Sequence, residues 1–255
     1  MTDDTLRSAL VDYALRLGDT SLVLGHRLSE WCGHAPELEE DLALANMALD
    51  LVGHARMWLA FAGETEGKGR DEDRLAYHRD GFDYRNHLLV EQPNRDFGHT
   101  IARQFLHDAW SVGLYERLAS SANPEVAGIA AKAVKEVRYH LRHSGEWVVR
   151  LGDGTEKSRA IMADAFDRLS RYTDEMFEAD GVERTLTAAG IAPDPEELRA
   201  GWEARVDAVL AEATLSRPAI HGRQTGGRSG RHTEHLGHLL AEMQFLQRAY
   251  PGATW

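Results

Sequence analysis

Two strings of this sequence decide the interpretation of the fold: Asp50-Leu51-Val52-Gly53-His54 and Glu136-Val137-Arg138-Tyr139-His140, which begin 86 residues apart. Each string places an acidic residue four positions before a histidine. A further acid precedes each string, because Asp19 lies 31 residues before Asp50 and Asp108 lies 28 residues before Glu136. The order acid, then acid-x-x-x-His, therefore occurs twice. This duplication indicates a metal site, or the remains of one.

Helical periodicity surrounds both strings, whereas alternating strand-like runs of Val, Ile and Thr are almost absent. We therefore expect an all-α fold. Four long helices should place the four acids on their apolar stripes, and shorter helices should connect and follow them. The expected helices cover residues 4–31, 36–63, 73–90, 96–121, 124–151, 156–179, 196–215 and 233–250.

Two long helix pairs joined by a middle connection predict a ferritin-like four-helix bundle with a long crossover and additional C-terminal helices. We expect one domain over residues 1–255, with the bundle core at about 4–151 and wrapping helices at about 155–250. At 255 residues with 43% hydrophobic content, the chain can bury a sizeable core.

Composition excludes several classes of function. The formal net charge of -12 argues against nucleic-acid binding. No window approaches 18 uncharged apolar residues, and the first residues lack a basic region followed by an apolar run, so we expect no membrane association and a cytoplasmic location. The single cysteine, Cys32, cannot form an internal disulfide or a cysteine-based metal site. Any metal would need carboxylates and imidazoles.

The spacing of the candidate ligands argues against a working metal centre. In ferritin-like di-iron proteins, two helices each give one Glu and two each give Glu-x-x-His. On a helix, residues three apart differ by about -60 degrees and residues four apart by about +40 degrees, so each histidine here is displaced around its helix. Three of the four acids are also the shorter Asp. We therefore predict a degenerate site without metal, formed by Asp19, Asp50, His54, Asp108, Glu136 and His140.

Three interpretations of these six residues remain open. They could be ordinary pairs on solvated helix faces, since acids and histidines at i and i+4 are common there. They could bind metal. We favour a polar core network, because four acids on apolar stripes would not be buried without partners.

A second unusual segment, residues 217–232, holds four arginines and two histidines in an otherwise acidic chain. It could bind phosphate groups, but no strand precedes it as a phosphate loop requires, so we favour a connector that is solvated or pinned against a partner. Whether Arg223 to Arg231 contacts such a phosphate-bearing ligand is left open. We expect His232, His235 and His238 to be surface or interface residues.

Several strings resemble the C subunits of bacterial phenylacetyl-coenzyme A epoxidases, which are multicomponent ring-epoxidising oxygenases of phenylacetate breakdown. These strings extend from the first predicted helix to the last. They are Leu28-Ser29-Glu30-Trp31-Cys32-Gly33-His34-Ala35-Pro36-Glu37-Leu38-Glu39-Glu40-Asp41, Ala48-Leu49-Asp50-Leu51, Leu89-Val90-Glu91-Gln92-Pro93-Asn94, Lys135-Glu136-Val137-Arg138-Tyr139-His140-Leu141-Arg142 and His232-Thr233-Glu234-His235-Leu236-Gly237.

The resemblance implies a ferritin-like structural subunit that has lost its metal and pairs with a related catalytic A subunit. In that family the A subunit holds the di-iron centre and binds the substrate, while a reductase with flavin and iron-sulfur groups supplies electrons. No cofactor and no catalytic residue is then expected in this chain, although contacts with other subunits and self-association are. Two alternatives stay open: a self-sufficient di-iron oxidoreductase that uses the six candidate residues, and a helical interaction protein outside aromatic degradation.

Overall fold

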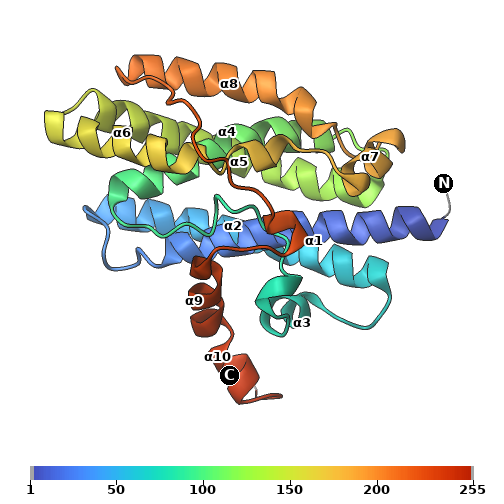
Figure 1. Cartoon of the computed structure of the whole chain (residues 1–255). Coiled ribbons are helices and arrows are strands. Elements are labelled where there is room, and N and C mark those ends of the chain that lie inside the picture. The colour runs from blue at the N-terminus through green and yellow to red at the C-terminus, as the bar shows by residue number, and fades with distance from the viewer. Residues whose placement is uncertain (1–2, 254–255) are drawn as a thin grey trace. The chain divides into compact units, whose positions relative to one another are not determined.

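The computed structural model describes residues 3–253, whose regular secondary structure is helical, with no strand in this range (Figure 1). The expected all-α class is therefore confirmed, and the chain order is that of a ferritin-like protein: a long helix pair, a long connection, a second long pair and further C-terminal helices. No helix among these described residues has the length and apolar character that crossing a membrane would require.

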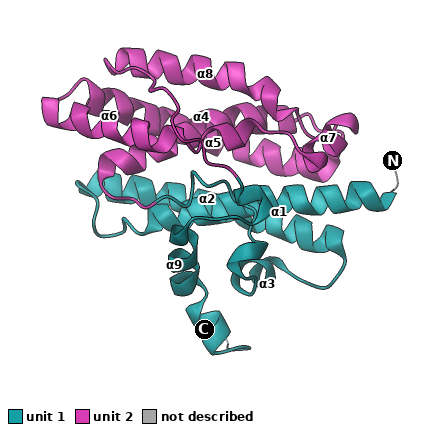
Figure 2. Cartoon of the chain, in the orientation of Figure 1, with its two compact units in different colours: residues 1–92, 226–255 teal, residues 93–225 magenta. Residues whose placement is uncertain are grey.

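The chain divides into two compact units (Figure 2). The first unit comprises Met1–Gln92 and Gly226–Trp255, and the second comprises Pro93–Thr225. The helices that we expected to wrap one core are shared between these units, because the last two belong to the first unit. A single domain over 1–255 stays a prediction, and its first two and last two residues lie outside the described range.

A long antiparallel helix pair forms the body of the first unit. Helix α1 spans Asp3–Ser29 and helix α2 spans Leu38–Glu66, and the two pack along each other. They approach closely at Gly25, where a Cβ atom would lie 3.2 Å from the Ala48 carbonyl oxygen. Helix α2 ends at Gly67, whose φ of 71° is the left-handed conformation that glycine adopts without strain.

Shorter elements complete the first unit, and α9 packs against α1. They are α3 (Glu72–Tyr77), the 3-10 helices η1 (Gly81–Asp83) and η3 (Gly227–Ser229), α9 (Glu234–Met243) and α10 (Phe245–Ala249).

The prediction of a helix over 73–90 is wrong beyond Tyr77. After that residue the chain runs through turns, and two of its backbone amides are bound by side chains of α1 instead of by helical carbonyls. The Arg85 amide donates to Asp19 at 2.8 Å, and the His87 amide donates to Thr20 Oγ1 at 3.3 Å. The final helix, expected over 233–250, is interrupted at Gln244 and forms α9 and α10.

Helix α4 is the centre of the second unit, since α5, α6 and α8 all pack against it (Figure 2). The helices are α4 (Phe97–Leu118), α5 (Pro124–Gly152), α6 (Glu156–Ser170), α7 (Gly181–Ala188) and α8 (Pro195–Glu212), with the 3-10 helix η2 at Asp174–Phe177.

Two predictions for the second unit need correction. The helix expected over 156–179 ends at Ser170, where the Thr173 hydroxyl binds the Ser170 carbonyl, and the chain continues into η2. Helix α7 was not predicted, although the sequence contains its signal. Asp180 and Glu183 form a capping box at its N-terminus.

Candidate functional site

The six predicted residues do not share one environment. Asp19, His54, Asp108 and His140 are buried, at 0–1% exposure. Asp50 and Glu136 are partly exposed, so the expectation that all four acids face inward is wrong for these two. Each of the two lies one helical turn from its buried histidine, near the margin of the buried face, because four residues rotate the side chain by about 40 degrees.

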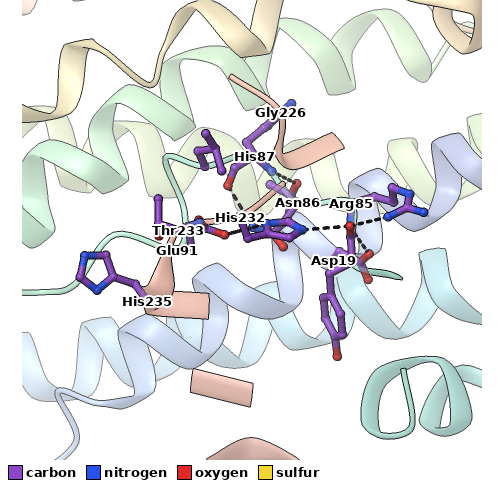
Figure 3. A network of polar contacts seen from close by, with 12 residues as sticks. Asp19, Arg85, Asn86, His87, Glu91, Gly226, His232, Thr233 and His235 are labelled. Atoms are coloured by element: carbon purple, nitrogen blue, oxygen red, sulfur yellow. Dashed lines mark hydrogen bonds and ion pairs between the residues drawn. The ribbon is translucent and has the colours of Figure 1, made fainter. Parts of the chain in front are cut away.

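The carboxylate of Asp19 is bound by an arginine of the connecting segment. Arg79 donates through Nη1 to Oδ2 at 3.0 Å and through Nη2 to Oδ1, and it is itself 5% exposed. The Arg85 backbone amide donates to the same Oδ2 (Figure 3). Both oxygens of Asp19 are therefore occupied, and a guanidinium supplies the positive charge that a buried carboxylate requires.

The same arginine holds the connecting segment together. Its guanidinium carbon lies 4.5 Å from the centre of the Tyr84 ring, and its Nη1 also donates to the Asp83 carbonyl. Burial alone would lower the pKa of Arg79, but the charge of Asp19 and the hydrogen bonds to it raise that pKa overall. For Tyr84 the effect of burial has the opposite sign, and it raises the pKa of the phenol, whose hydroxyl accepts a hydrogen bond from Gln244. The cluster thus contains a permanently cationic arginine beside a neutral phenol.

A second buried carboxylate, Glu91, joins the connecting segment to the C-terminal segment of the first unit (Figure 3). It is fully buried, and Asn86 Nδ2 and His232 Nδ1 lie 3.0 and 2.9 Å from its Oε2. The Thr233 amide donates to its Oε1 at 2.6 Å. His232 was expected to be a surface or interface residue; its side chain instead binds an acid of its own chain 141 residues away, and whether it also lies at an interface stays a prediction.

Arg27 of α1 holds the same two segments by their backbones. Its guanidinium donates to the Glu91 carbonyl oxygen, at 2.9 Å from Nη2, and to the His235 carbonyl oxygen at 3.2 Å. Sequence reasoning identified neither Arg27 nor Glu91 as a site residue. The string Leu89-Val90-Glu91-Gln92-Pro93-Asn94 drew attention to this segment only through the family resemblance.

In the second unit, Asp108 of α4 is bound by uncharged groups. Gln104 Nε2 donates to its Oδ1 at 2.8 Å and the Ser144 hydroxyl donates to its Oδ2 at 2.8 Å. Burial raises the pKa of Asp108 to about 7, against the opposing influence of the His140 charge and of these hydrogen bonds. Near neutral pH this carboxyl group therefore holds a proton for much of the time.

These surroundings do not fit a di-iron centre. Iron needs several ionised carboxylates with free oxygen lone pairs. Asp19 instead has both oxygens bound by protein donors, and the two oxygens of Asp108 likewise accept from Gln104 and Ser144. Within residues 3–253, no three His, Cys, Asp or Glu side chains are grouped as a metal site would require.

A groove of about 750 Å³ runs between α5 and α8 in the second unit. Its apolar lining includes Phe105, Leu141 and Val149, and its polar lining includes Arg142 and Arg150. None of the six predicted residues lines it. The buried carboxylate of the same unit, Asp108, is therefore not part of the lining of this groove.

The arginine-rich segment is pinned by acids of the second unit. Arg217 lies 3.0 Å from both Glu203 and Asp207. Arg223 lies 3.0 Å from Asp174 and 3.3 Å from a further acid, Glu178. The preferred interpretation of a pinned connector agrees with these contacts, although the partner is the chain itself.

Two comparisons place this chain among known proteins. The family described as phenylacetic acid catabolic protein matches residues 1–255. The chain is also 56% identical, over 246 residues, to a protein from Escherichia coli (strain K12) that is named as the C subunit of 1,2-phenylacetyl-CoA epoxidase. That alignment covers 96% of this chain and 99% of the relative.

Proposed function

The chain belongs to the phenylacetic acid catabolic protein family, and we propose that within this family it serves as the structural, non-catalytic C subunit of a 1,2-phenylacetyl-CoA epoxidase. A role in phenylacetate catabolism follows from the family membership and from the relative's name. The finer proposal is that this subunit pairs with a catalytic A subunit that holds the di-iron centre. Flavin and iron-sulfur groups would belong to a separate reductase, and the complex would work in the cytoplasm.

One observation carries the non-catalytic part of the proposal: the buried carboxylates at two of the candidate metal positions already have partners from the protein itself. Arg79 neutralises Asp19, and Gln104 and Ser144 bind Asp108. A self-sufficient di-iron oxidoreductase would have to displace Arg79, at the cost of leaving a buried guanidinium without its counter-charge. A helical interaction protein outside aromatic degradation does not account for the 56% identity.

The proposed benefit to the complex is mechanical. A catalytic site functions only when its reacting groups are held within a fraction of an ångström by a supporting shell. A rigid helical subunit, with its connecting segments fixed through buried ion pairs, can supply such support to the helices of a partner.

The first test measures metal and turnover. We expect the purified chain to bind less than about 0.1 iron per chain and to leave phenylacetyl-CoA unchanged with the reductase. The A subunit should turn over slowly alone and recover activity when this chain is added. About two irons per chain together with turnover, or full activity of the A subunit alone, would contradict the proposal.

A matched pair of variants tests whether Asp108 is catalytic. Asp108→Asn keeps the size of the side chain and groups that can hydrogen-bond to Gln104 and Ser144, and Asp167→Asn makes the same change at an exposed position of α6. Both should leave turnover of the reconstituted complex within about twofold of wild type. A selective loss of about a hundredfold or more in Asp108→Asn is typical of a catalytic proton donor or acceptor, and it would overturn the structural assignment.

A further inference from the structure

Helix α5 carries a basic face in an acidic chain. The helix holds five basic and three acidic residues, whereas α2 holds one basic and six acidic residues and α8 holds two and five. Three of the bases of α5, Lys132, Lys135 and Arg142, are exposed. At about 100 degrees per residue, their side chains fall within about 80 degrees of one another around the helix. We call these three residues the α5 basic face.

No ion pair within residues 3–253 involves the α5 basic face. Its neighbour Arg138, by contrast, lies 2.7 Å from Glu116 of α4. The other acids near the face lie at its margins, because Glu136 is turned about 40 degrees past the nearest lysine and Glu146 lies one helical turn beyond Arg142. The face therefore keeps a local positive charge that ion pairs within the chain do not offset.

The groove between α5 and α8 adjoins this face, since Arg142 belongs to both. Gly145 of α5 opens the groove, because a Cβ atom added there would lie 3.7 Å from the Phe105 ring and 3.9 Å from Val209 of α8. These are ordinary contact distances, so the apolar lining has room to receive further apolar atoms.

The polar lining of the groove extends the positive charge of the face. It consists of three arginines and two glutamates: Arg142, Arg150, Arg205, Glu146 and Glu212. With the two lysines of the α5 basic face added, the groove and the face hold five bases and two acids. An occupant that matches both surfaces must therefore combine apolar groups with negative charge.

The dimensions favour a segment of protein over a small anion. Lys132 and Gly145 lie 13 residues apart on α5, which corresponds to about 20 Å at about 1.5 Å per residue. Small-molecule sites are concave and enclose most of their ligand, whereas the basic face is an exposed helix surface. A nucleic acid would extend past this face onto a chain with a net charge of -12.

We propose that the groove and the α5 basic face together form the docking site for an acidic, amphipathic segment of the catalytic subunit. This inference rests on the proposed function, because the partner is the subunit assigned there. The apolar side of the segment enters the groove, and its carboxylates face the two lysines and Arg142. A second copy of the chain is a poorer occupant, because two chains of net charge -12 repel each other.

The first experiment reverses one charge of the face. Lys135→Glu acts on the α5 basic face, and Lys157→Glu makes the same change at an exposed lysine of α6 that also forms no ion pair. Association of the full-length chain with the purified A subunit is followed by stopped flow. At about 50 mM salt we expect Lys135→Glu to slow association about tenfold and Lys157→Glu to change it less than twofold. The difference should nearly vanish at about 500 mM salt, where charges are screened.

The second experiment fills the groove. Ala208 is exposed and lines the groove, so Ala208→Trp places a large side chain there. Ala200→Trp is the matched control, because Ala200 is exposed on the same helix but is turned about 80 degrees away and does not line the groove. Calorimetry should show binding to the A subunit about thirtyfold or more weaker for Ala208→Trp and unchanged for Ala200→Trp. If either tryptophan variant misfolds, Ala208→Glu and Ala200→Glu replace the pair, and only the former should weaken binding, by repelling an acidic segment.

The outcomes separate this inference from the proposed function. The inference requires both effects, so a Lys135 or Ala208 variant that behaves like its control overturns it and leaves the function in place. Failure of the wild-type chain to bind the A subunit overturns both.

Two further results would identify a different occupant and overturn the inference. One is binding of phenylacetyl-CoA to the purified chain that Ala208→Trp abolishes, which would assign the groove to a small anion. The other is a wild-type dimer in light scattering that Ala208→Trp converts to monomer while binding to the A subunit persists, which would assign the groove to a second copy.

Discussion

Replacing Asp108 by Asn should remove a strong pH dependence from the stability of this chain. Burial raises the pKa of Asp108 from its ordinary value of 3.8 to about 7 in the folded protein. Between these values the folded chain keeps the proton, whereas the unfolded chain loses it. The free energy of unfolding therefore falls as the pH rises from about 4 to about 7. At about 1.4 kcal/mol for each pKa unit, the loss amounts to about 4 kcal/mol.

The asparagine variant does not titrate and preserves the local hydrogen bonds. Its carbonyl oxygen can accept from Gln104, and its amide can donate to the Ser144 hydroxyl, which also acts as an acceptor. The two proteins should thus have similar stability near pH 4. At pH 8 the variant should be more stable by about 4 kcal/mol.

Urea denaturation followed by circular dichroism, at intervals between pH 4 and pH 8, measures this difference directly. Subtracting the two curves cancels every titration that the proteins share. Asp167→Asn, at an exposed carboxylate of α6, should give a nearly flat difference curve. Parallel curves for wild type and Asp108→Asn, or greater stability of the wild type at pH 8, would refute the conclusion that burial governs this group.

Three further substitutions test the core of the first unit and the packing of α2, and a fourth serves as a control. Arg79→Met should cost about 3–5 kcal/mol in thermal unfolding, since it leaves a buried carboxylate without its counter-charge; an unchanged melting temperature would contradict a stabilising role for this ion pair. Glu91→Gln should cost about 2–4 kcal/mol and expose residues 226–253 to proteolysis, because an amide cannot accept all of its present donors. The same change at the exposed Glu116, which pairs with an arginine on α5, should cost less than about 1 kcal/mol. Gly63→Ala should cost about 2 kcal/mol or more by denaturation, because its Cβ atom would lie 2.0 Å from the Arg70 carbonyl oxygen; an unchanged midpoint would show that this turn can shift.

The long helices could be predicted from the sequence because their signals are local. The helix expected over 124–151 is found at Pro124–Gly152, where Asn123 caps the first turn and proline occupies its first position. The apolar period of the others was long enough to fix their centres, and their ends agree to within a few residues. The same reasoning failed over 78–90, where backbone amides bind side chains of α1 instead of forming a helix.

The candidate site was predicted less well, and the errors follow from its long-range contacts. The sequence indicated that Asp19 and Asp108 would be buried and that the metal geometry was degenerate. It could not show that Asp19 pairs with Arg79, because neither residue has an unusual local pattern. The Glu91 and His232 pair was missed for the same reason, since 141 residues separate the two side chains.

The sequence by itself thus determined the helical class, the order of the long helix pairs and the burial of several acids, because periodicity and capping act over a few residues. Only the tertiary structure decided what those acids bind and which of them stay at the margin of the core. The physical reason is that a buried charge is stabilised by whichever donors the fold brings within about 3 Å. Apart from Gln104, which lies one turn before Asp108, the side-chain donors to Asp19 and Asp108 and the His232 partner of Glu91 lie 36 to 141 residues away along the chain.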